Sequence, residues 1–326
     1  MKLLITGGTG MLGQALLRRY HDRFEIAFTG RNRALGHALA SETSAQFFPL
    51  ELTDKSALEQ ACHTVDAVIH CAALSSPWGS FTAFNQANVQ GTDNLLAAAE
   101  RQQVPRFVHI STPSLYFQFR DALDIHESQT LPKRFCNHYA ATKAIAEQAV
   151  KRSSLHSVIL RPRGIFGPHD NAILPRIIAA VRNGNLWLPS GRNPRVDLTY
   201  VDNVADAAIL AATREVASES IYNISNGEPV QLLDVLSRLF EQLGEPTRIR
   251  PLPYPLLAPV ISAAEKLHHY WPGQPEPTLT RYSAALFHFH QTLNIDRARH
   301  ELGYQPTVSI DEGIQRYVHW RQRSLV

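Results

Sequence analysis

Residues 1–13 read MKLLITGGTGMLG, and this stretch decides the fold. Lys2 to Thr6 is an apolar run of strand length that ends at a turn rich in glycine. From Met11 onward the apolar residues recur at helical spacing, which predicts a helix directly after the turn. A strand, a glycine turn and a helix N-terminus together favour an anion, because exposed N–H groups and the positive end of the helix dipole face it.

The glycines of this turn follow the pattern Gly-x-x-Gly-x-x-Gly at Gly7, Gly10 and Gly13. The first gap is one residue longer than in the common dinucleotide fingerprint. Such glycines permit the tight turn, the close approach of a pyrophosphate and the close packing of helix on strand. The sequence therefore predicts a dinucleotide site, with cofactor contacts from Gly7, Thr9, Gly10, Met11, Leu12 and Gly13.

The second predicted strand runs from Phe24 to Thr29, and the residues after it indicate which dinucleotide is bound. In NAD-binding proteins an acidic residue at this point holds the ribose hydroxyls. This chain has Gly30 and Arg31 instead, so no carboxylate repels a 2′-phosphate and a planar cation can pair with it. We expect NADP(H) rather than NAD(H). The alternative is that Arg31 and Arg33 are ordinary exposed loop charges.

Strands and helices alternate along the first part of the chain. Strands are predicted at 45–50, 66–70 and 107–111, and helices at 55–63 and 82–103. This alternation is typical of βαβ units and a parallel sheet. We therefore predict an α/β fold with a doubly wound Rossmann-type parallel sheet.

The composition is that of a soluble globular protein, with 326 residues, 44% hydrophobic and 19% charged. The net charge of +3 comes without a long basic block, which gives no reason to expect nucleic acid as a partner. No apolar run approaches the length of a membrane span. Three cysteines have neither disulfide nor metal-ligand spacing, and the His-rich stretches 268–269 and 288–290 lack further ligands. We expect reduced thiols in the cytoplasm and no metal.

Further motifs follow the glycine turn along the chain. They read HCAA at 70–73, NVQGT at 88–92, YAATK at 139–143, LRPRGIFGP at 160–168, TYVDN at 199–203 and LGYQP at 302–306. Together with the turn, they resemble the motifs of extended short-chain dehydrogenases/reductases, the NAD-dependent epimerase/dehydratase superfamily, essentially from end to end. Trp78-Gly79, the STPS run at 111–114 and Val196-Asp197 resemble its 3β-hydroxysteroid dehydrogenase branch.

The resemblance implies a smaller C-terminal substrate-binding domain, in agreement with the irregular spacing of elements beyond about residue 163. The NADP-binding Rossmann domain would comprise 1–165, with 196–227 and part of the C-terminus returning to it. The substrate-binding subdomain would comprise 166–195 and 228–296. A homodimer through the helices at 82–103 and 137–152 is a further implication of the resemblance.

The resemblance also implies cofactor contacts beyond the glycine turn. Small residues after the strand at 66–70 suit a flat ring lying against the backbone, and Glu51 stands where the family usually has Asp near the adenine. Asn88 either lines the site or only anchors backbone, and His70 is expected to be a satisfied core histidine. The expected contacts are Glu51, Leu52, Cys71, Ala72, Ala73, Asn88, Tyr139, Lys143, Pro162, Gly164 and Ile165.

Tyr139 and Lys143 lie four residues apart in a strongly helical stretch, so they share one face. A phenol with a pKa near 10 is a poor base at neutral pH, and a neighbouring ammonium lowers that pKa. The family pattern adds a hydroxyl at the end of the fifth strand, which falls on Thr112, with Ser111 as its neighbour. We predict Thr112, Tyr139 and Lys143 as the catalytic residues. Without the glycine turn upstream, a Tyr/Lys pair on a helix would be interpreted as two ordinary surface residues.

Aromatic residues beside the expected nicotinamide site point to an apolar substrate. The predicted substrate contacts are Trp78, Phe81, Thr112 and Phe166. Residues 253–271 form an apolar amphipathic stretch with an aromatic end, predicted to be a helix. It is either a packed lid or an entrance for a lipid-like substrate with peripheral membrane contact.

These features favour an NAD(P)-dependent oxidoreductase that interconverts a secondary alcohol and a ketone on a hydrophobic substrate, sterol-like or a long-chain 3-oxo or 3-hydroxy compound. One alternative is a nucleotide-sugar epimerase or dehydratase. Against it, Thr112 is followed by Pro113-Ser114 rather than Asp-Glu, and Val196 rather than Arg precedes Asp197. The other is an NADP-sensing regulator without catalysis, which typically loses the Tyr/Lys pair that this chain keeps.

Overall fold

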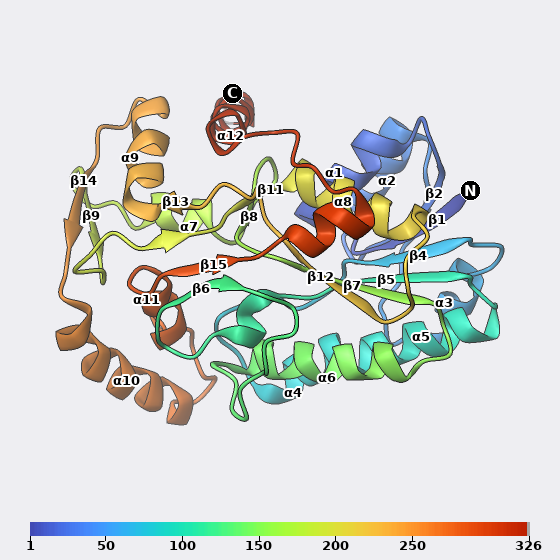
Figure 1. Cartoon of the computed structure of the whole chain (residues 1–326), viewed down its shortest axis with the longest axis horizontal. Coiled ribbons are helices and arrows are strands. Elements are labelled where there is room, and N and C mark those ends of the chain that lie inside the picture. The colour runs from blue at the N-terminus through green and yellow to red at the C-terminus, as the bar shows by residue number, and fades with distance from the viewer. Residues whose placement is uncertain (325–326) are drawn as a thin grey trace.

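A computed structural model describes residues 1–324 (Figure 1). Its larger part is built on a seven-stranded sheet with the order β12-β7-β5-β4-β1-β2-β3, in which every neighbouring pair is parallel. These strands are β1 (Lys2–Thr6), β2 (Glu25–Thr29), β3 (Gln46–Phe48), β4 (Ala67–His70), β5 (Arg106–Ile110), β7 (Ser157–Pro162) and β12 (Ser220–Ile224). The predicted doubly wound parallel sheet is confirmed.

Helices cover both faces of this sheet because successive side chains of each strand point to opposite sides. Leu3 and Ile5 of β1 belong to one core with the helices drawn above the sheet in Figure 1, whereas Leu4 belongs to a second core below it. The upper helices are α1 (Met11–Tyr20), α2 (Arg33–Thr43), α8 (Val201–Thr213) and α12 (Ile310–Ser324). The lower helices are α3 (Lys55–Ala61), α5 (Gly91–Arg101) and α6 (His138–Arg152).

The strand order reverses between β1 and β4. From β1 the chain adds β2 and β3 on one side, and from β4 it adds β5, β7 and β12 on the other. In open parallel sheets, ligands bind in the crevice outside the carboxyl ends of the strands at such a reversal. We therefore expect the segments that follow β1, β4, β5 and β7 to line the ligand site.

The helix predicted at 82–103 contains an irregular turn. It consists of α4 (Phe81–Phe84), a π-helical stretch at Asn85–Gln90 and α5. A π-helical turn inside an α-helix often marks a functional site. Here the turn contains Asn88, which is almost fully buried.

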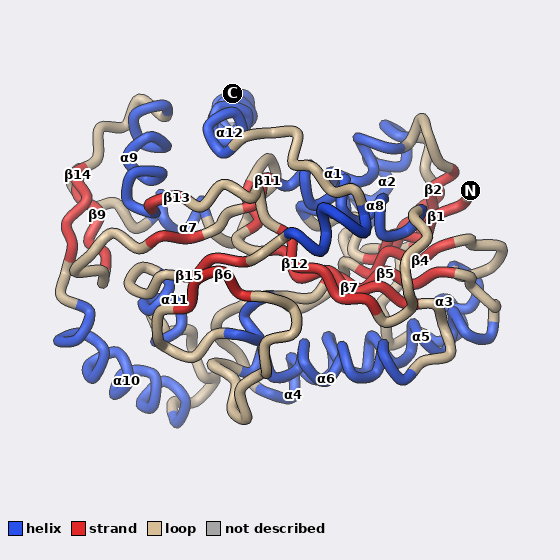
Figure 2. The backbone as a smooth tube through the Cα atoms, viewed as in Figure 1, coloured by secondary structure: helices blue, strands red, loops and turns tan. Residues whose placement is uncertain are grey.

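A second, smaller sheet has the order β13-β10-β15-β6 and mixes parallel and antiparallel pairs. In Figure 2 its short strands lie to the left of the seven-stranded sheet. Its strands are β6 (Ala122–Ile125), β10 (Arg195–Val196), β13 (Val230–Gln231) and β15 (Gln291–Leu293). Strand β6 falls inside the range expected to form the dinucleotide domain, yet it pairs with β15, about 170 residues later along the chain, at Gln291↔Ala122.

Two further strand pairs and several helices complete this end of the molecule. Pairing is parallel between β8 (Ile165–Phe166) and β11 (Thr199–Tyr200), and between β9 (Asn185–Leu188) and β14 (Arg248–Pro251). The helices are α7 (Leu174–Ala179), α9 (Leu232–Gln242), α10 (Tyr254–Tyr270) and α11 (Arg281–Leu286). The predicted helix at 253–271 is therefore present as α10.

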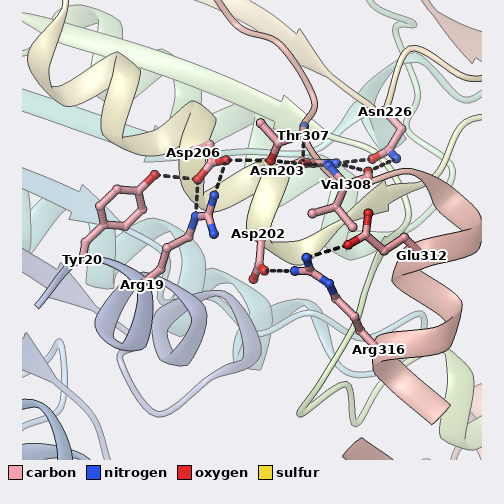
Figure 3. A network of polar contacts seen from close by, with 10 residues as sticks. All are labelled: Arg19, Tyr20, Asp202, Asn203, Asp206, Asn226, Thr307, Val308, Glu312 and Arg316. Atoms are coloured by element: carbon pink, nitrogen blue, oxygen red, sulfur yellow. Dashed lines mark hydrogen bonds and ion pairs between the residues drawn. The ribbon is translucent and has the colours of Figure 1, made fainter. Parts of the chain in front are cut away.

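A polar network fastens the C-terminal part of the chain to the helix that follows the glycine turn (Figure 3). Asp206 of α8 accepts hydrogen bonds from Arg19 and Tyr20 of α1, each at 2.5 Å. Asn203, one turn earlier, donates to the carbonyl of Val308 at 2.8 Å. Helix α8 thus connects α1 with the segment that leads into α12.

Candidate active site

The glycine turn between β1 and α1 leaves no room for side chains. Gly7 has φ +69, and a Cβ there would lie 2.9 Å from the Cα of Ala72. A Cβ on Gly13 would lie 2.4 Å from the carbonyl oxygen of Gly7. No side chain caps the N-terminus of α1, and its first turn holds no acidic residue. The N–H groups in the first turn of α1 therefore fit the pyrophosphate of a dinucleotide.

Arg31 follows β2 and Glu51 follows β3 by three residues. Both side chains are exposed, and Asn32 caps α2 by accepting from the N–H of Leu35 at 3.1 Å. Helix α2 therefore begins at Arg33. Gly30, the residue before Arg31, adjoins the glycine turn, since a Cβ there would lie 2.7 Å from Thr9 Cγ2. The carbonyl of Leu52 accepts from Asn94 Nδ2 at 2.9 Å.

The segment after β4, from Cys71 to Ala73, lies against the glycine turn. Thr6 Oγ1 accepts from the N–H of Ala72 at 3.3 Å and contacts His70 Nδ1 at 2.7 Å. Because Thr92 donates to a carbonyl, His70 Nε2 must donate to Thr92 Oγ1, 3.0 Å away. Burial, with the cation of Lys143, lowers the pKa of His70 to about 3. His70 is a neutral core histidine, as expected. All three cysteines are free thiols.

Asn88 holds the loop after β4 in place. Its side chain accepts from the N–H of Leu74 at 2.7 Å and donates to the carbonyl of the same residue at 3.1 Å. It also donates to Thr142 Oγ1 of α6 at 3.2 Å. Of the two alternatives, the structure favours the backbone anchor. Asn88 acts on the site through the loop that it fixes.

Tyr139 lies in the first turn of α6, which starts where Asn137 accepts from the N–H of Ala140 at 2.8 Å. Burial raises the pKa of the Tyr139 phenol, and the nearby hydroxyls of Ser75 and Thr112 partly offset this rise. The structure thus brings Tyr139 and Thr112 together, and Ser75 is an additional hydroxyl that the sequence pattern did not indicate.

Lys143 is 2% exposed, and its ammonium is held by the end of β5. Nζ donates to the carbonyl of Ile110 at 2.7 Å and lies 2.9 Å from Nε2 of His109. Burial lowers the pKa of Lys143 to about 8. The sequence predicted that this ammonium lowers the pKa of Tyr139, but the phenol's pKa is raised instead. The reason is that burial of the ring dominates while Lys143 is bound to two acceptors on β5.

A chain of three hydroxyl groups connects Thr112, after β5, with Tyr282 on α11. Thr112 Oγ1 donates to Ser114 Oγ at 3.0 Å, and Ser114 Oγ lies 2.6 Å from the hydroxyl of Tyr282 on α11. Ser111 Oγ is buried without a hydrogen-bond partner among the described residues. Thr112 therefore matches the predicted role better than Ser111, because it reaches Tyr139 and is itself oriented by Ser114.

The predicted substrate residues divide into two groups. The loop of Trp78 and Phe81 lies near the site, since Phe81 packs edge-on against His138, the neighbour of Tyr139, with ring centroids 5.7 Å apart. Trp78 Nε1 donates to the carbonyl of Gln274 at 2.9 Å. Phe166 is 4% exposed and packs against Tyr200 in the main core, so the structure does not group it with the other two.

Helix α10 packs on α11 with one face and exposes the other. Tyr254 and Ile261 are buried in a cluster that also contains Phe117 and two alanines of α11. Its opposite face exposes Leu256, Val260, Leu267 and Tyr270. Among residues 1–324, no helix has both the length and the apolar character needed to cross a membrane.

Comparisons with known proteins agree with this geometry. The family model described as "NAD dependent epimerase/dehydratase family" matches residues 3–225. A 2-alkyl-3-oxoalkanoate reductase of Stenotrophomonas maltophilia is 35% identical over 97% of this chain and 98% of its own. A decarboxylating sterol-4-alpha-carboxylate 3-dehydrogenase of Candida albicans is 30% identical over 99% of this chain and 98% of its own.

The fold is also similar to solved structures. The NAD complex of a Bacillus cereus UDP-glucuronic acid 4-epimerase superposes with a TM-score of 0.78 over 99% of both chains, at 20% identity. At that identity the likeness concerns the fold alone.

Proposed function

This chain belongs to the NAD dependent epimerase/dehydratase family, and we propose that it is an NADP(H)-dependent oxidoreductase. Its reaction interconverts a secondary alcohol and a ketone on a hydrophobic substrate, sterol-like or a long-chain 3-oxo or 3-hydroxy compound. The observation that carries the proposal is the meeting of the Tyr139 phenol with Ser75 and Thr112, on the same helix as Lys143.

Each catalytic group has a separate task. When bound, NADPH would supply the hydride for the carbonyl carbon. Tyr139 donates its proton to the carbonyl oxygen, and Thr112 holds that oxygen by a hydrogen bond once its hydroxyl turns from Ser114 toward the substrate. The raised pKa keeps the phenol protonated at neutral pH, which suits a proton donor in the direction of reduction. Lys143, beside Cys71 and the end of β5, is in reach of the nicotinamide ribose in this family's arrangement.

The cofactor preference rests on Arg31. Arg31→Ala is expected to remove a preference for NADPH over NADH of roughly tenfold or more, because a charge-assisted contact to the 2′-phosphate is lost. Fluorescence titration of both dinucleotides measures this preference. Arg120→Ala, an exposed arginine of another loop, is the control and should change neither affinity. Equal affinities of the unmutated protein for the two cofactors would contradict the assignment.

The hydrophobic substrate is supported by the apolar surroundings of the hydroxyl chain. Phe117 packs edge-on against Tyr282, with ring centroids 5.2 Å apart, and Phe119 and Phe289 adjoin it. Val196 is 3% exposed and offers no cation for a diphosphate. The named relatives act, by their names, on an oxoalkanoate and a sterol carboxylate.

Substrate polarity can be tested with two panels of compounds. Oxidation of NADPH is expected with long-chain and sterol-like ketones and not with nucleotide sugars, because each buried aliphatic or aromatic contact contributes on the order of 1.5–3 kcal/mol. Activity should rise with chain length in the first panel. Turnover confined to the nucleotide sugars would instead support an epimerase or dehydratase, and binding of cofactor without any turnover would support a regulator.

Two further expectations belong to this proposal. A homodimer would form through α5 and α6, which pack side by side below the sheet in Figure 1. Helix α10 would cover the substrate as a lid or, with its exposed apolar face, contact a membrane surface from which a lipid-like substrate is taken.

A further inference from the structure

Arg163 follows the last residue of β7, at the edge of the sheet where ligands bind in this fold. Its backbone is fixed on both sides. The N–H donates to the carbonyl of Ile224 at 3.0 Å, and the carbonyl accepts from Thr199 Oγ1 at 2.5 Å. The position of the side chain is therefore determined by the main sheet rather than by a free loop.

The guanidinium of Arg163 is buried but not paired. The residue is 7% exposed, and its Nε has no hydrogen-bond partner among the described residues. Asp197 acts on it electrostatically. However, Asp197 directs Oδ2 to the N–H of Leu293 at 2.6 Å, and its Oδ1 has no partner. Within residues 1–324, no ion pair with Arg163 is formed.

Arg161 provides a comparison on the same strand. It is 2% exposed, and its guanidinium forms an ion pair with Glu147, with Nε donating to Oε1 at 2.8 Å. This is how buried arginines are normally compensated, since an ion removed from water is costly unless it is paired. Among the described residues Arg163 has the electrostatic influence of Asp197 but no ion pair or hydrogen bond of this kind, so an anion from outside the chain would supply the missing partner.

The unpaired cation acts electrostatically on Tyr282, the last member of the hydroxyl chain that begins at Thr112. Burial raises the pKa of the Tyr282 phenol, and the positive charge of Arg163 partly offsets that rise. Tyr282 is joined to Thr112 through Ser114, with contacts of 2.6 and 3.0 Å. An anionic group held by Arg163 would therefore lie on the Tyr282 side of the hydroxyl chain that ends at Thr112.

We propose that Arg163 binds a carboxylate of the substrate, so that the enzyme acts on 3-oxo or 3-hydroxy acids and not on neutral ketones of the same length. In such acids the carboxylate carbon is two bonds from the reacting carbon, which matches an anion site next to the catalytic hydroxyls. The planar guanidinium binds a carboxylate through two parallel hydrogen bonds. This inference rests on the oxidoreductase function proposed above and adds a charged group to its hydrophobic substrate.

The test compares a long-chain 3-hydroxy acid with its methyl ester, both stable in water, in the presence of NADP⁺. Calorimetry gives the affinity of each ligand, and NADPH formation gives kcat/KM. The unmutated enzyme is expected to prefer the acid. Arg163→Met should weaken acid binding on the order of a hundredfold more than ester binding, because only the acid loses a charged pair. Arg163→Lys should recover part of the preference, since it keeps the charge without the planar pair of donors.

Arg195→Met is the matched control, since Arg195 is an exposed arginine on β10 near Asp197 and should leave the preference unchanged. Cofactor affinity of each variant verifies that it is folded. Equal loss for acid and ester, or no preference in the unmutated enzyme, would overturn the carboxylate site. Arg163-dependent acid binding without turnover of either ligand would leave this site intact and refute the oxidoreductase function. Arg163-dependent binding of UDP-glucuronic acid in place of the hydroxy acid would refute both.

Discussion

Replacing Tyr139 with phenylalanine is expected to lower kcat by roughly 10²- to 10⁴-fold, the usual contribution of a positioned acid or base. The substitution removes one hydroxyl, and with it the proton that the carbonyl oxygen receives and the contacts to Ser75 and Thr112. The ring and its packing against Phe84, with centroids 6.3 Å apart, remain. Affinity for NADPH should therefore change little. Steady-state turnover of the best ketone, together with NADPH titration, measures both quantities.

Two companion variants make this experiment specific. Lys143→Ala should weaken turnover and cofactor binding together, because the proposed function assigns Lys143 a contact with the ribose from its position at the end of β5. Tyr270→Phe removes a hydroxyl from a residue that is 84% exposed and should have no effect. Substantial turnover by Tyr139→Phe would show that another group supplies the proton.

The second large effect concerns stability and the buried pair of Glu147 and Arg161. Their side chains are 4% and 3% exposed, and Arg161 also lies over the ring of Tyr116 at 4.9 Å. Glu147→Ala leaves an uncompensated guanidinium in the core, which is expected to lower the free energy of unfolding by about 3–5 kcal/mol. Urea unfolding followed by circular dichroism measures the loss.

A double replacement distinguishes two contributions to the free energy of unfolding. One is the cost of leaving the Arg161 guanidinium unpaired, and the other is the stabilisation that the ion pair itself provides. Glu147→Leu combined with Arg161→Met should be far more stable than Glu147→Ala alone, because apolar residues of similar volume replace a buried ion pair at little cost. Glu42→Ala, which breaks the partly exposed pair with Arg18, should cost only about 0–1 kcal/mol. If Glu147→Ala lowered the free energy of unfolding by less than Glu42→Ala does, Glu147 would not be compensating the buried charge of Arg161.

Local patterns in the sequence were sufficient for much of the fold. The strand at Lys2–Thr6 and the helix from Met11 are present as predicted, because one apolar run and three glycines allow few other arrangements. The helical spacing of Tyr139 and Lys143 likewise places both on α6. These predictions depend on neighbours within a few residues, which a sequence displays directly.

The rest of the site depends on contacts between distant segments. Tyr282 reaches Ser114 across 168 positions, and no periodicity near either residue announces the contact. His109 is another example, since a histidine inside an apolar strand does not reveal that Lys143 will be its partner. The pKa of Tyr139 was predicted with the wrong sign for the same reason, because the burial of a side chain is a property of the whole fold.

The pairing of β6 with β15 has a consequence for how the protein is made. Translation at about 5–20 residues per second separates the appearance of these two strands by roughly 10–30 s. During that interval β1 and α1 have already been synthesised. Strand β6 has also been synthesised, but its edge stays unpaired until β15 follows. The glycine turn between β1 and α1 is thus made well before β15 and before α11, the helix that carries Tyr282.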